Sequence, residues 1–393
     1  MTDHLSFRVP NIGEEMDWAS SLDFDIKGVY CESDAGLLSS ERIGDALKLK
    51  QSNGINQARR NKYLMNKSAK AFGLNTVEQK LCKNLDEALE FARKLGLNRD
   101  TSSTENTRRC VVKPLRGVAS EEVYLCDDLL EVEQAFNQVK GSQIYGSPHK
   151  THKNVLVQEF AEGIEYAVDI VSRNGEHKVA ALWKYDKRAV NGAPFVYHAT
   201  MLADANTVEG KVACEYAMSA LDAVQFKWGL SHVEVMVDTE LNAKLIEINC
   251  RQHNTDFAPM TTVCIGYNAL DMLLAAYFFD VPESNFPLDT KDERLDWDML
   301  PKLPTPLLTG AIVHLVCHVE GEVMEVRGLD QIDQLSSVQA LHLYPSFSVG
   351  NYVEKTIDIR SDSGFAHLIN ADEDEFFRDY NEILKIMPKM FLV

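Results

Sequence analysis

The chain has 393 residues and a formal net charge of −19, from 40 basic and 59 acidic side chains. Apolar residues make up 45% and charged residues 25%, a composition typical of globular proteins, and the length favours two or three domains. Because nucleic acids and anionic membranes select a basic face, the acidic charge argues against both as partners.

Neither a membrane span nor a secretion signal is expected. No stretch approaches the roughly 18 apolar residues of a transmembrane helix, and the polar N-terminal segment lacks the apolar core of a signal peptide. The cysteines form no CxxC pair, and Cys110, Cys126, Cys250 and Cys317 lie in apolar, strand-like runs. Reduced, buried thiols are therefore expected, which favours a cytoplasmic protein.

The first quarter of the sequence is mainly helical in pattern. Residues 27–31 predict a short buried strand, and residues 33–49 predict a helix that begins at a serine suited to capping its N-terminus. Two more helices are expected over 58–73 and 85–96, before a polar linker over 98–107. A lone strand in this region has no earlier strand to pair with.

From residue 109 the pattern becomes rich in strands. The expected strands cover 109–115, 123–126, 154–160, 165–172, 178–185, 231–238 and 243–250. A helix over 267–279, a boundary over 282–293 and a final segment of strands and one helix follow. Strands and helices that alternate without a regular βαβ rhythm indicate an α+β fold, with an antiparallel sheet that carries the central site.

Strands 231–238 and 243–250 are joined by a short polar connection and predict a β-hairpin. If the valines of the first strand meet the isoleucines of the second on the buried face, Glu234 shares the other face with Glu247 and Asn249. One register that fits the turn puts Glu234 directly across from Glu247, and a register slipped by two residues stays open.

Two carboxylates that face each other repel unless water surrounds them or a cation lies between them. A solvent-exposed face is one interpretation of this hairpin. The other is a site for Mg²⁺, because carboxylate and amide oxygens suit this ion, which commonly bridges to substrate phosphates. Arg251, two residues beyond Asn249, would then stabilise charge on a phosphoryl group in transfer.

Two further segments suit a nucleotide. Lys113 ends an apolar strand and precedes a loop, where a lysine can hold phosphates; an ordinary lysine at a strand end is the alternative. Gln158, Glu159 and Phe160 end another strand, and Glu165 opens the next one. Such a hinge can present backbone groups to a purine and a carboxylate to ribose; a strand–turn–strand without a ligand is the alternative.

Taken in order, these segments resemble the ATP-grasp family. The resemblance rests on KP (113–114), QEFxxGxEYxVD (158–169), HxEVM (232–236) and LIEINxR (245–251). It is greatest for the carboxylate–amine ligases typified by L-amino-acid ligases and carnosine synthase, and it runs from about residue 27 to the end of the chain. The family implies an α+β fold in which two subdomains grip ATP between antiparallel sheets.

The resemblance also predicts domain boundaries. It implies a partial α/β domain over 1–58, an ATP-grasp domain over 59–290, with subdomains 59–157 and 158–290, and a C-terminal α+β subdomain over 300–393. Family members begin with a fuller α/β domain, so the chain is expected to enter that domain partway. A truncated gene model, a partner chain or a genuine short form would each account for this start.

By position, the resemblance implies a role for the polar residues of these motifs. Arg251 and Lys113 are the expected catalytic residues, and Glu234, Glu247 and Asn249 are the expected Mg²⁺ ligands. Gln158 and the backbone of Glu159 and Ala161 are expected to face adenine. The full nucleotide-binding set is Lys62, Lys113, Ser120, Gln158, Glu159, Phe160, Ala161 and Glu165.

Four residues are implied in substrate binding. Lys187 and Arg188 fall within residues 183–198, where such ligases have a mobile segment near the substrate. Either Lys187 and Arg188 bind a substrate carboxylate, or they are charged side chains of a loop that water surrounds. His253 and Asn254 lie where these ligases shape the pocket for the acceptor.

The phosphate loop departs from the family pattern. It is usually glycine-rich, but residues 116–123 read RGVASEEV, with Ala119 and Glu122 where glycines are common. Glycine lets the backbone approach phosphate closely, and a nearby carboxylate opposes phosphate. Either Glu122 points outward or nucleotide affinity is reduced.

The expected function is therefore that of an ATP- and Mg²⁺-dependent carboxylate–amine ligase, with Mn²⁺ as an alternative ion. It forms an amide or peptide bond through an acyl-phosphate, on amino acids or similar small molecules, and a homodimer is left open. One alternative is another ATP-grasp ligase, of the purine-pathway or carboxylase-like kind. The other is a catalytically inactive ATP-binding protein.

Overall fold

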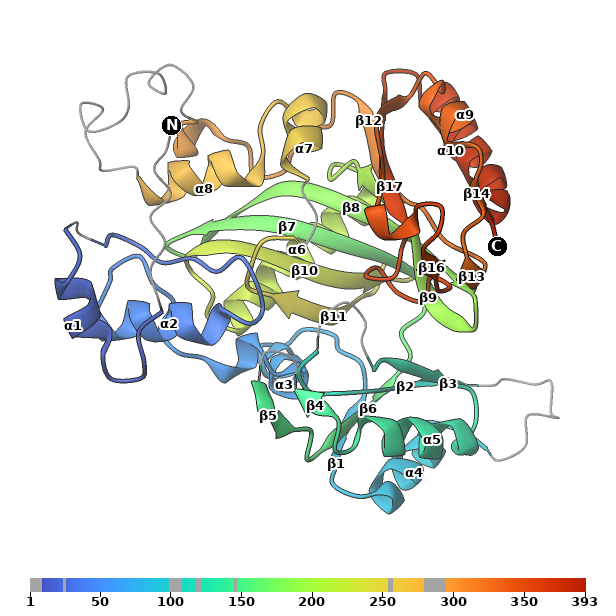
Figure 1. The fold of residues 1–393 in the computed structure, drawn as a ribbon. Helices are drawn as coiled ribbons and strands as arrows, with labels where there is room; N and C mark the ends of the chain where they lie inside the picture. Colours follow the sequence, from blue (N-terminus) through green and yellow to red (C-terminus); the bar gives the residue numbers. More distant parts are fainter. Residues whose placement is uncertain are drawn as a thin grey trace.

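A computed structural model describes residues 9–23, 26–98, 108–117, 122–144, 147–253, 257–278 and 295–393 (Figure 1). Ser120, Ala119 and Asn254 lie outside the described residues, as do the whole predicted boundary at 282–293 and all of the linker at 98–107 except residue 98. Within the described ranges, no helix has the length and apolar character needed to cross a membrane.

The smaller of the two main sheets has four antiparallel strands in the order β1-β6-β2-β3. They are β1 (Gln79–Cys82), β2 (Cys110–Lys113), β3 (Tyr124–Cys126) and β6 (Val155–Glu159). Helices α4 (Leu85–Lys94) and α5 (Leu129–Val139) pack their apolar faces on one side of this sheet and close its core. A short hairpin of β4 (Gln143–Ile144) and β5 (Ser147–Thr151) lies beside it.

The larger sheet has eight strands in the order β11-β10-β7-β8-β9-β12-β17-β15, and each neighbouring pair is antiparallel. The strands are β7 (Ile164–Arg173), β8 (Glu176–Val190), β9 (Ala193–Ala203), β10 (Gly229–Val237), β11 (Ala243–Asn249), β12 (Thr309–His314), β15 (Val338–Leu343) and β17 (Gly364–Asn370). This sheet therefore joins the expected second ATP-grasp subdomain to the C-terminal residues.

Helices cover the two faces of the larger sheet differently. On one face, α3 (Lys62–Ala71) and α6 (Val208–Ala223) pack against the apolar side chains of β7, β10 and β11. On the other face, α7 (Ala258–Ile265) and α8 (Ala269–Tyr277) cover only part of the sheet (Figure 1). The remaining part of this second face carries the polar side chains that line the main pocket.

The C-terminal residues add their own small core. Helices α9 (Leu329–Asp333) and α10 (Glu373–Ile386) pack with β12, β15 and β17 around Phe376, Tyr380 and Ile383. Asp372 caps α10 by accepting from the Glu375 N–H, and three acidic residues fill its first turn, which favours the positive end of the helix. The short strands are β13 (Gly321–Glu322), β14 (Glu325–Val326), β16 (Tyr352–Val353) and β18 (Phe391–Leu392).

The N-terminal region differs from the prediction at one strand. It contains α1 (Glu15–Ser20) and α2 (Leu37–Ala46), but residues 27–31 form only an isolated bridge between Gly28 and Gln51. The predicted buried strand is therefore wrong: Tyr30 is exposed, because no sheet in the described residues offers this segment an edge. The residue at the N-terminus of α2 is Gly36, not the predicted serine, and no side chain caps this helix.

Candidate active site

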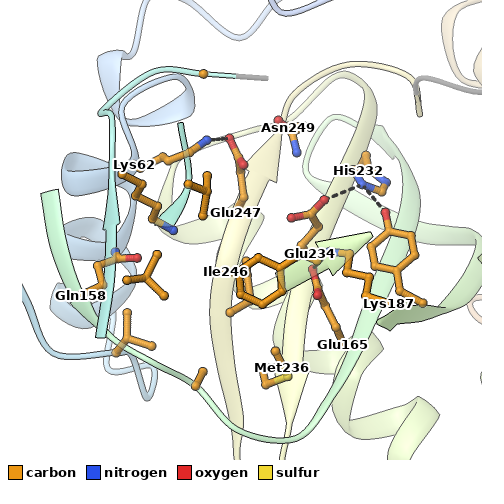
Figure 2. Close-up of a pocket in the computed structure, with 18 of the residues that line it drawn as sticks. Lys62, Gln158, Glu165, Lys187, His232, Glu234, Met236, Ile246, Glu247 and Asn249 are labelled. Atoms are coloured by element: carbon orange, nitrogen blue, oxygen red, sulfur yellow. Dashed lines mark hydrogen bonds and ion pairs between the residues drawn. The ribbon is translucent and has the colours of Figure 1, made fainter. Parts of the chain in front are cut away.

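A deep pocket lies between the two main sheets. The smaller sheet and α3 supply Lys62, Lys113 and Gln158, and strands β10 and β11 of the larger sheet form the opposite wall. Figure 2 shows Lys62 and Gln158 on one side of this space and Glu234 and Glu247 on the other. Lys62, Lys113 and Gln158 are buried, so the charges in this pocket interact with little screening from bulk water.

The hairpin register that the sequence predicted is confirmed. Glu234 of β10 pairs directly with Glu247 of β11, and His232 pairs with Asn249. A β-bulge next to the Glu234 pair shifts the register by one residue. Because of this bulge, Leu245 packs in the core and Ile246 lines the pocket, so the predicted alternation, with Ile246 on the buried face, is wrong.

Each of the two facing carboxylates has a cationic partner. Glu247 forms an ion pair with Lys62, and Glu234 lies 3.3 Å from Nε2 of His232. Although burial raises the pKa of Glu234, the hydrogen bond from His232 and the charge of Lys187 hold it well below its usual range. Together with the Asn249 amide, the pair offers the hard oxygen ligands that Mg²⁺ prefers.

The surroundings of Lys113, at the end of β2 in the smaller sheet, disfavour its charged form. Burial, followed by the nearby charge of Lys62, lowers the pKa of Lys113 to about 8. Glu247, Glu234 and Glu165 oppose this shift. A buried lysine in this condition gains a great deal from an anion placed beside it, and a polyphosphate is such an anion.

The hinge between β6 and β7 has one backbone N–H without a partner among the described residues. Glu159 donates its N–H to the Glu78 carbonyl, and Phe160 donates to the Arg109 carbonyl. Ala161 lines the pocket, and its N–H and C=O make no hydrogen bond to any described residue. Of the three hinge residues, Ala161 therefore has the backbone N–H that a purine edge could use.

The side chains at this end of the pocket are also engaged. Gln158 donates to the Gln79 side chain at 3.0 Å, and the Glu159 carboxylate accepts from Lys244 at 2.7 Å. The rings of Phe160 and Phe195 lie nearly parallel, with centroids 6.4 Å apart. Both rings line the pocket and give this end an aromatic wall.

Lys187 and Arg188 lie on opposite sides of β8. Lys187 points into the pocket, where its Nζ lies 2.7 Å from the Glu165 carboxylate and 4.5 Å from the ring centroid of Tyr185. Arg188 is half exposed and pairs with Asp186 outside the pocket. Residues 183–198 form most of the β8–β9 hairpin, which turns at Asn191 and Gly192.

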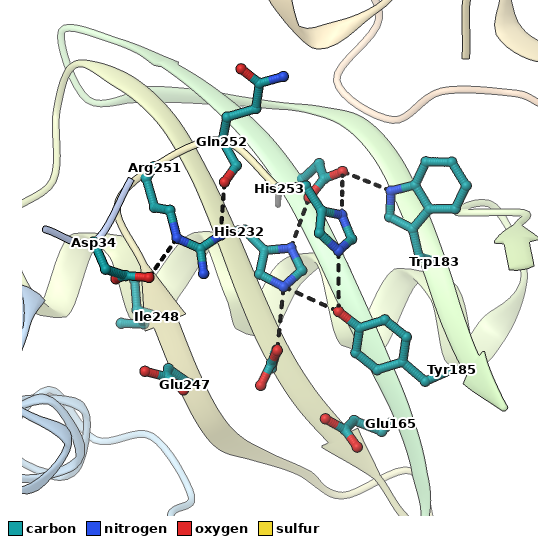
Figure 3. A network of polar contacts seen from close by, with 12 residues as sticks. Asp34, Glu165, Trp183, Tyr185, His232, Glu247, Ile248, Arg251, Gln252 and His253 are labelled. Atoms are coloured by element: carbon teal, nitrogen blue, oxygen red, sulfur yellow. Dashed lines mark hydrogen bonds and ion pairs between the residues drawn. The ribbon is translucent and has the colours of Figure 1, made fainter. Parts of the chain in front are cut away.

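A buried carboxylate that the sequence argument left without a role organises the far end of the pocket. Asp169 accepts hydrogen bonds from the Trp183 indole at 2.7 Å, from His232 Nδ1 at 3.0 Å and from His253 Nδ1 at 3.2 Å (Figure 3). The Tyr185 hydroxyl lies 3.2 Å from Nε2 of His232 and 3.3 Å from Nε2 of His253.

The two histidines of this network differ in charge. Burial opposes a charged His232, but its hydrogen bonds to Asp169 and Glu234 raise its pKa to about 9. Burial and the neighbouring charge of His232 lower the pKa of His253 to about 4. At neutral pH, His232 is therefore a cation that donates to both carboxylates, and neutral His253 accepts from the Tyr185 hydroxyl.

Asp169, His232 and His253 also bring metal-binding types of atom within 4.8 Å of one another. Each of these side chains already has hydrogen-bonding partners in the protein. Hydrogen bonding alone therefore accounts for this cluster. Its visible effect is to hold Glu234 in place through His232.

Arg251 is held at the edge of the pocket next to Glu247 and Asn249. Its Nε donates to Asp34 at 2.8 Å and its Nη1 donates to the Gln252 carbonyl at 2.7 Å (Figure 3). Although burial opposes the charge, the Asp34 carboxylate raises the pKa of this guanidinium. Arg251 is thus a fixed, permanent cation in the pocket wall.

The phosphate-loop residues 118–121 lie outside the described residues, but Glu122 is defined. It has φ of 57°, a left-handed conformation that favours glycine, which explains why glycine would suit this position. Its carboxylate accepts from the Ser142 hydroxyl at 2.7 Å, and Glu122 does not line the pocket. The arrangement therefore matches the outward-pointing alternative.

Comparison with known proteins gives this geometry a family context. Residues 107–258 match the family model of the ATP-grasp domain. The chain is 28% identical over 256 residues to dapdiamide A synthase of Enterobacter agglomerans, and this match covers 64% of the chain and 57% of that protein. The match thus spans little more than half the length of this curated relative.

Solved structures share the fold over nearly the whole chain. The L-amino acid ligase from Bacillus licheniformis superposes with a TM-score of 0.68 at 18% identity, over 94% of this chain and 82% of that one. N5-carboxyaminoimidazole synthetase from Staphylococcus aureus, complexed with ADP, superposes with a TM-score of 0.59 at 13% identity, over 97% and 85%. Residues 107–258 therefore match an ATP-grasp domain, and nearly the whole chain shares the α+β fold of these solved structures.

Proposed function

We propose that the protein is an ADP-forming ligase that joins a carboxylate to an amine. One observation carries this proposal: Lys62 and Lys113 line the same pocket as the oxygen ligands of Glu234, Glu247 and Asn249. Lysines for phosphates and hard ligands for a divalent cation are what transfer of a phosphoryl group from ATP requires.

ATP would lie with its base against the hinge and its phosphates between the two sheets. The free backbone groups of Ala161, the Gln158 side chain and the aromatic wall suit adenine, and Glu165 suits the ribose hydroxyls. Lys62 and Lys113 would neutralise phosphate charge. Before that, Lys62 must leave the Glu247 carboxylate, so nucleotide and metal binding are expected to favour each other.

Glu234, Glu247 and Asn249 would hold Mg²⁺, with Mn²⁺ as an alternative. When bound, this ion neutralises charge that develops on the transferred phosphoryl oxygens. His232 would keep Glu234 ionised and oriented toward the metal. Arg251 would donate to the phosphoryl group in transfer and then to the acyl-phosphate.

The reaction has two steps in this proposal. A substrate carboxylate oxygen attacks the γ-phosphorus of ATP, the bond to the β-phosphate oxygen breaks, and ADP leaves. The amine nitrogen then attacks the acyl carbon, the bond to the phosphate oxygen breaks, and the amine loses a proton. The pocket's contribution is to position the reactants and to neutralise charge.

Amino acids or similar small molecules are the proposed substrates. This follows from the relatives, which include a dapdiamide synthase and an L-amino acid ligase by name. Lys187 is the one basic side chain of β8 that lines the pocket, and it forms an ion pair with Glu165. If Glu165 binds the ribose hydroxyls instead, Lys187 can bind a substrate carboxylate. Neutral His253 and Tyr185 give that end a polar but uncharged surface for the acceptor.

The experiment is to measure ADP release by the purified chain with Mg²⁺-ATP, across pools of amino acids and small acids, with mass analysis of the products. The proposal predicts release that needs both a carboxylate and an amine, with an amide among the products. Release that needs bicarbonate and an amino-imidazole nucleotide would instead support the purine-pathway alternative. Binding of Mg²⁺-ATP without release by any pair would favour the inactive ATP-binding protein.

A further inference from the structure

Asp34 connects residues that are far apart in the sequence. Its Oδ2 lies 2.8 Å from Arg251 Nε, and its Oδ1 lies 3.3 Å from Arg60 Nη1. Arg60 in turn donates at 3.4 Å to the carbonyl of Gly117, which lies in the loop that follows β2. One carboxylate from the N-terminal region therefore contacts the arginine that follows β11 and, through Arg60, the backbone of the phosphate loop.

The contact between Asp34 and Arg251 is buried, and it leaves one nitrogen of Arg251 without a partner among the described residues. The side chains of Asp34 and Arg251 are each 5% exposed. Asp34 and the Gln252 carbonyl occupy Nε and Nη1, whereas Nη2 makes no hydrogen bond within the described residues (Figure 3). Because two of the three nitrogens are held, the direction in which Nη2 donates is fixed before any ligand binds.

We propose that Asp34 is a positioning residue that aims the free Nη2 of Arg251 at the phosphoryl group in transfer. This rests on the proposed role of Arg251. A fixed donor stabilises a transition state more than a substrate, because it need not reorganise when charge develops. Loss of Asp34 should therefore weaken stabilisation of the transferred group more than it weakens ATP binding.

The test compares the wild-type chain with Asp34→Asn, which keeps the shape of the side chain and removes its charge. Two probes are titrated by calorimetry: Mg²⁺-ATP, and Mg²⁺-ADP with aluminium fluoride, which imitates a phosphoryl group in transfer. We expect the affinity for the mimic and the rate of ADP release to fall about tenfold to a hundredfold. The affinity for Mg²⁺-ATP should change less than about threefold. Equal losses for both probes would overturn the proposal.

Glu41→Gln is the matched control. Glu41 pairs with Arg59 in the same N-terminal region at 2.7 Å and does not line the pocket. This change should lower the melting temperature and leave the ratio of the two affinities unaltered. A selective loss of affinity for the mimic in this control as well would assign the effect to general loosening of the N-terminal region.

A double-mutant cycle tests whether Asp34 acts through Arg251. When Asp34→Asn is added to Arg251→Ala, the affinity for the mimic should fall by less than about a further threefold, because the guanidinium that Asp34 positions is already absent. A full, additive loss would contradict the positioning role. A wild-type chain that binds both probes but releases no ADP with any substrate pair would contradict the ligase, while the ratio of affinities would still decide the role of Asp34.

Discussion

Two buried arginines of this molecule have similar carboxylate partners but different surroundings. Arg59 pairs with Glu41, and its three nitrogens also donate to four backbone carbonyls, of Asn53, Gly54, Val224 and Gln225. Arg251 pairs with Asp34 and donates to a single carbonyl, that of Gln252. Arg59 lies outside the pocket, whereas Arg251 lines it.

The comparison separates a structural cation from one that is available to a ligand. A buried charge needs hydrogen bonds to offset the loss of water, and Arg59 obtains them entirely from the protein. Among the described residues, Nη2 of Arg251 has no hydrogen-bond partner, and Arg251 lines the same pocket as Glu234 and Glu247. Arg59 should therefore determine stability, and Arg251 should determine turnover.

The largest effect is expected from Glu247→Gln, which removes a proposed metal ligand beside Arg251. ADP release should be abolished, because the variant loses a charge at the metal and no core packing. The far-ultraviolet circular dichroism should stay close to that of the wild type, whereas loss of the ion pair with buried Lys62 should lower the melting temperature. Normal turnover by this variant would show that the metal assignment is wrong.

Arg251→Lys should reduce the rate of ADP release about a hundredfold to a thousandfold, because lysine cannot contact Asp34 and reach the phosphoryl group together. The measurement is the steady-state rate at saturating Mg²⁺-ATP, with the melting temperature as a control for folding. A rate within about threefold of the wild type would contradict the assigned role, since a transition-state donor is normally worth far more.

Arg59→Met should have the opposite signature. It leaves Glu41 buried without its partner, so the free energy of unfolding should fall by about 3–5 kcal/mol. Turnover per folded molecule should be unchanged. Arg378→Ala is the matched control, because this arginine is 66% exposed and solvent screens its ion pairs, so the loss should be much smaller. Urea denaturation followed by circular dichroism measures the free energy of unfolding of both variants. Equal losses of stability in the two variants would contradict a structural role for Arg59.

The smallest expected effect is on pH dependence, and it belongs to Lys113. With a pKa of about 8, this lysine loses its proton above that pH, and the affinity for Mg²⁺-ATP should then fall. Bound phosphate restores the charge, so binding near pH 8.5 should take up a proton. Calorimetry in buffers of different ionisation enthalpy measures this uptake. No uptake, with Lys113→Met as the reference, would contradict a phosphate role for Lys113.

The same pKa predicts the sign of a stability change. Because the folded chain releases the Lys113 proton at about pH 8 and the unfolded chain at about 10.5, the unfolded state binds more protons between these values. The contribution of Lys113 to the free energy of unfolding should therefore rise with pH from about 8 to 10.5. Lys113→Met should remove this slope.

The two strands of the hairpin were predictable from their alternation and their short connection. The connection fits the facing of Glu234 and Glu247 that the structure has, but it also left a register slipped by two residues open. Ile246 was assigned to the wrong face, because a bulge is a local insertion that alternation cannot show. Alternation would also have separated Lys187 from Arg188, had their strand been extended that far.

Two of the residues found in the site were harder to predict. Asp169 shares strand parity with Glu165, a signal that was present in the EYAVD segment, but its three donors come from distant parts of the chain. Asp34 lies 217 residues before Arg251, and no local pattern connects them.

The helix α6 also gave little signal, because small apolar residues occupy much of its surface and weaken its helical periodicity.

The proposed reaction depends on activation of a carboxylate by phosphorylation in this pocket. The most direct measurement follows oxygen from a carboxylate labelled with ¹⁸O, in the substrate pair that supports ADP release. One labelled oxygen should appear in the released phosphate, because the bond between carbon and that oxygen breaks when the amine attacks. Unlabelled phosphate, or release of AMP and pyrophosphate, would contradict an acyl-phosphate route.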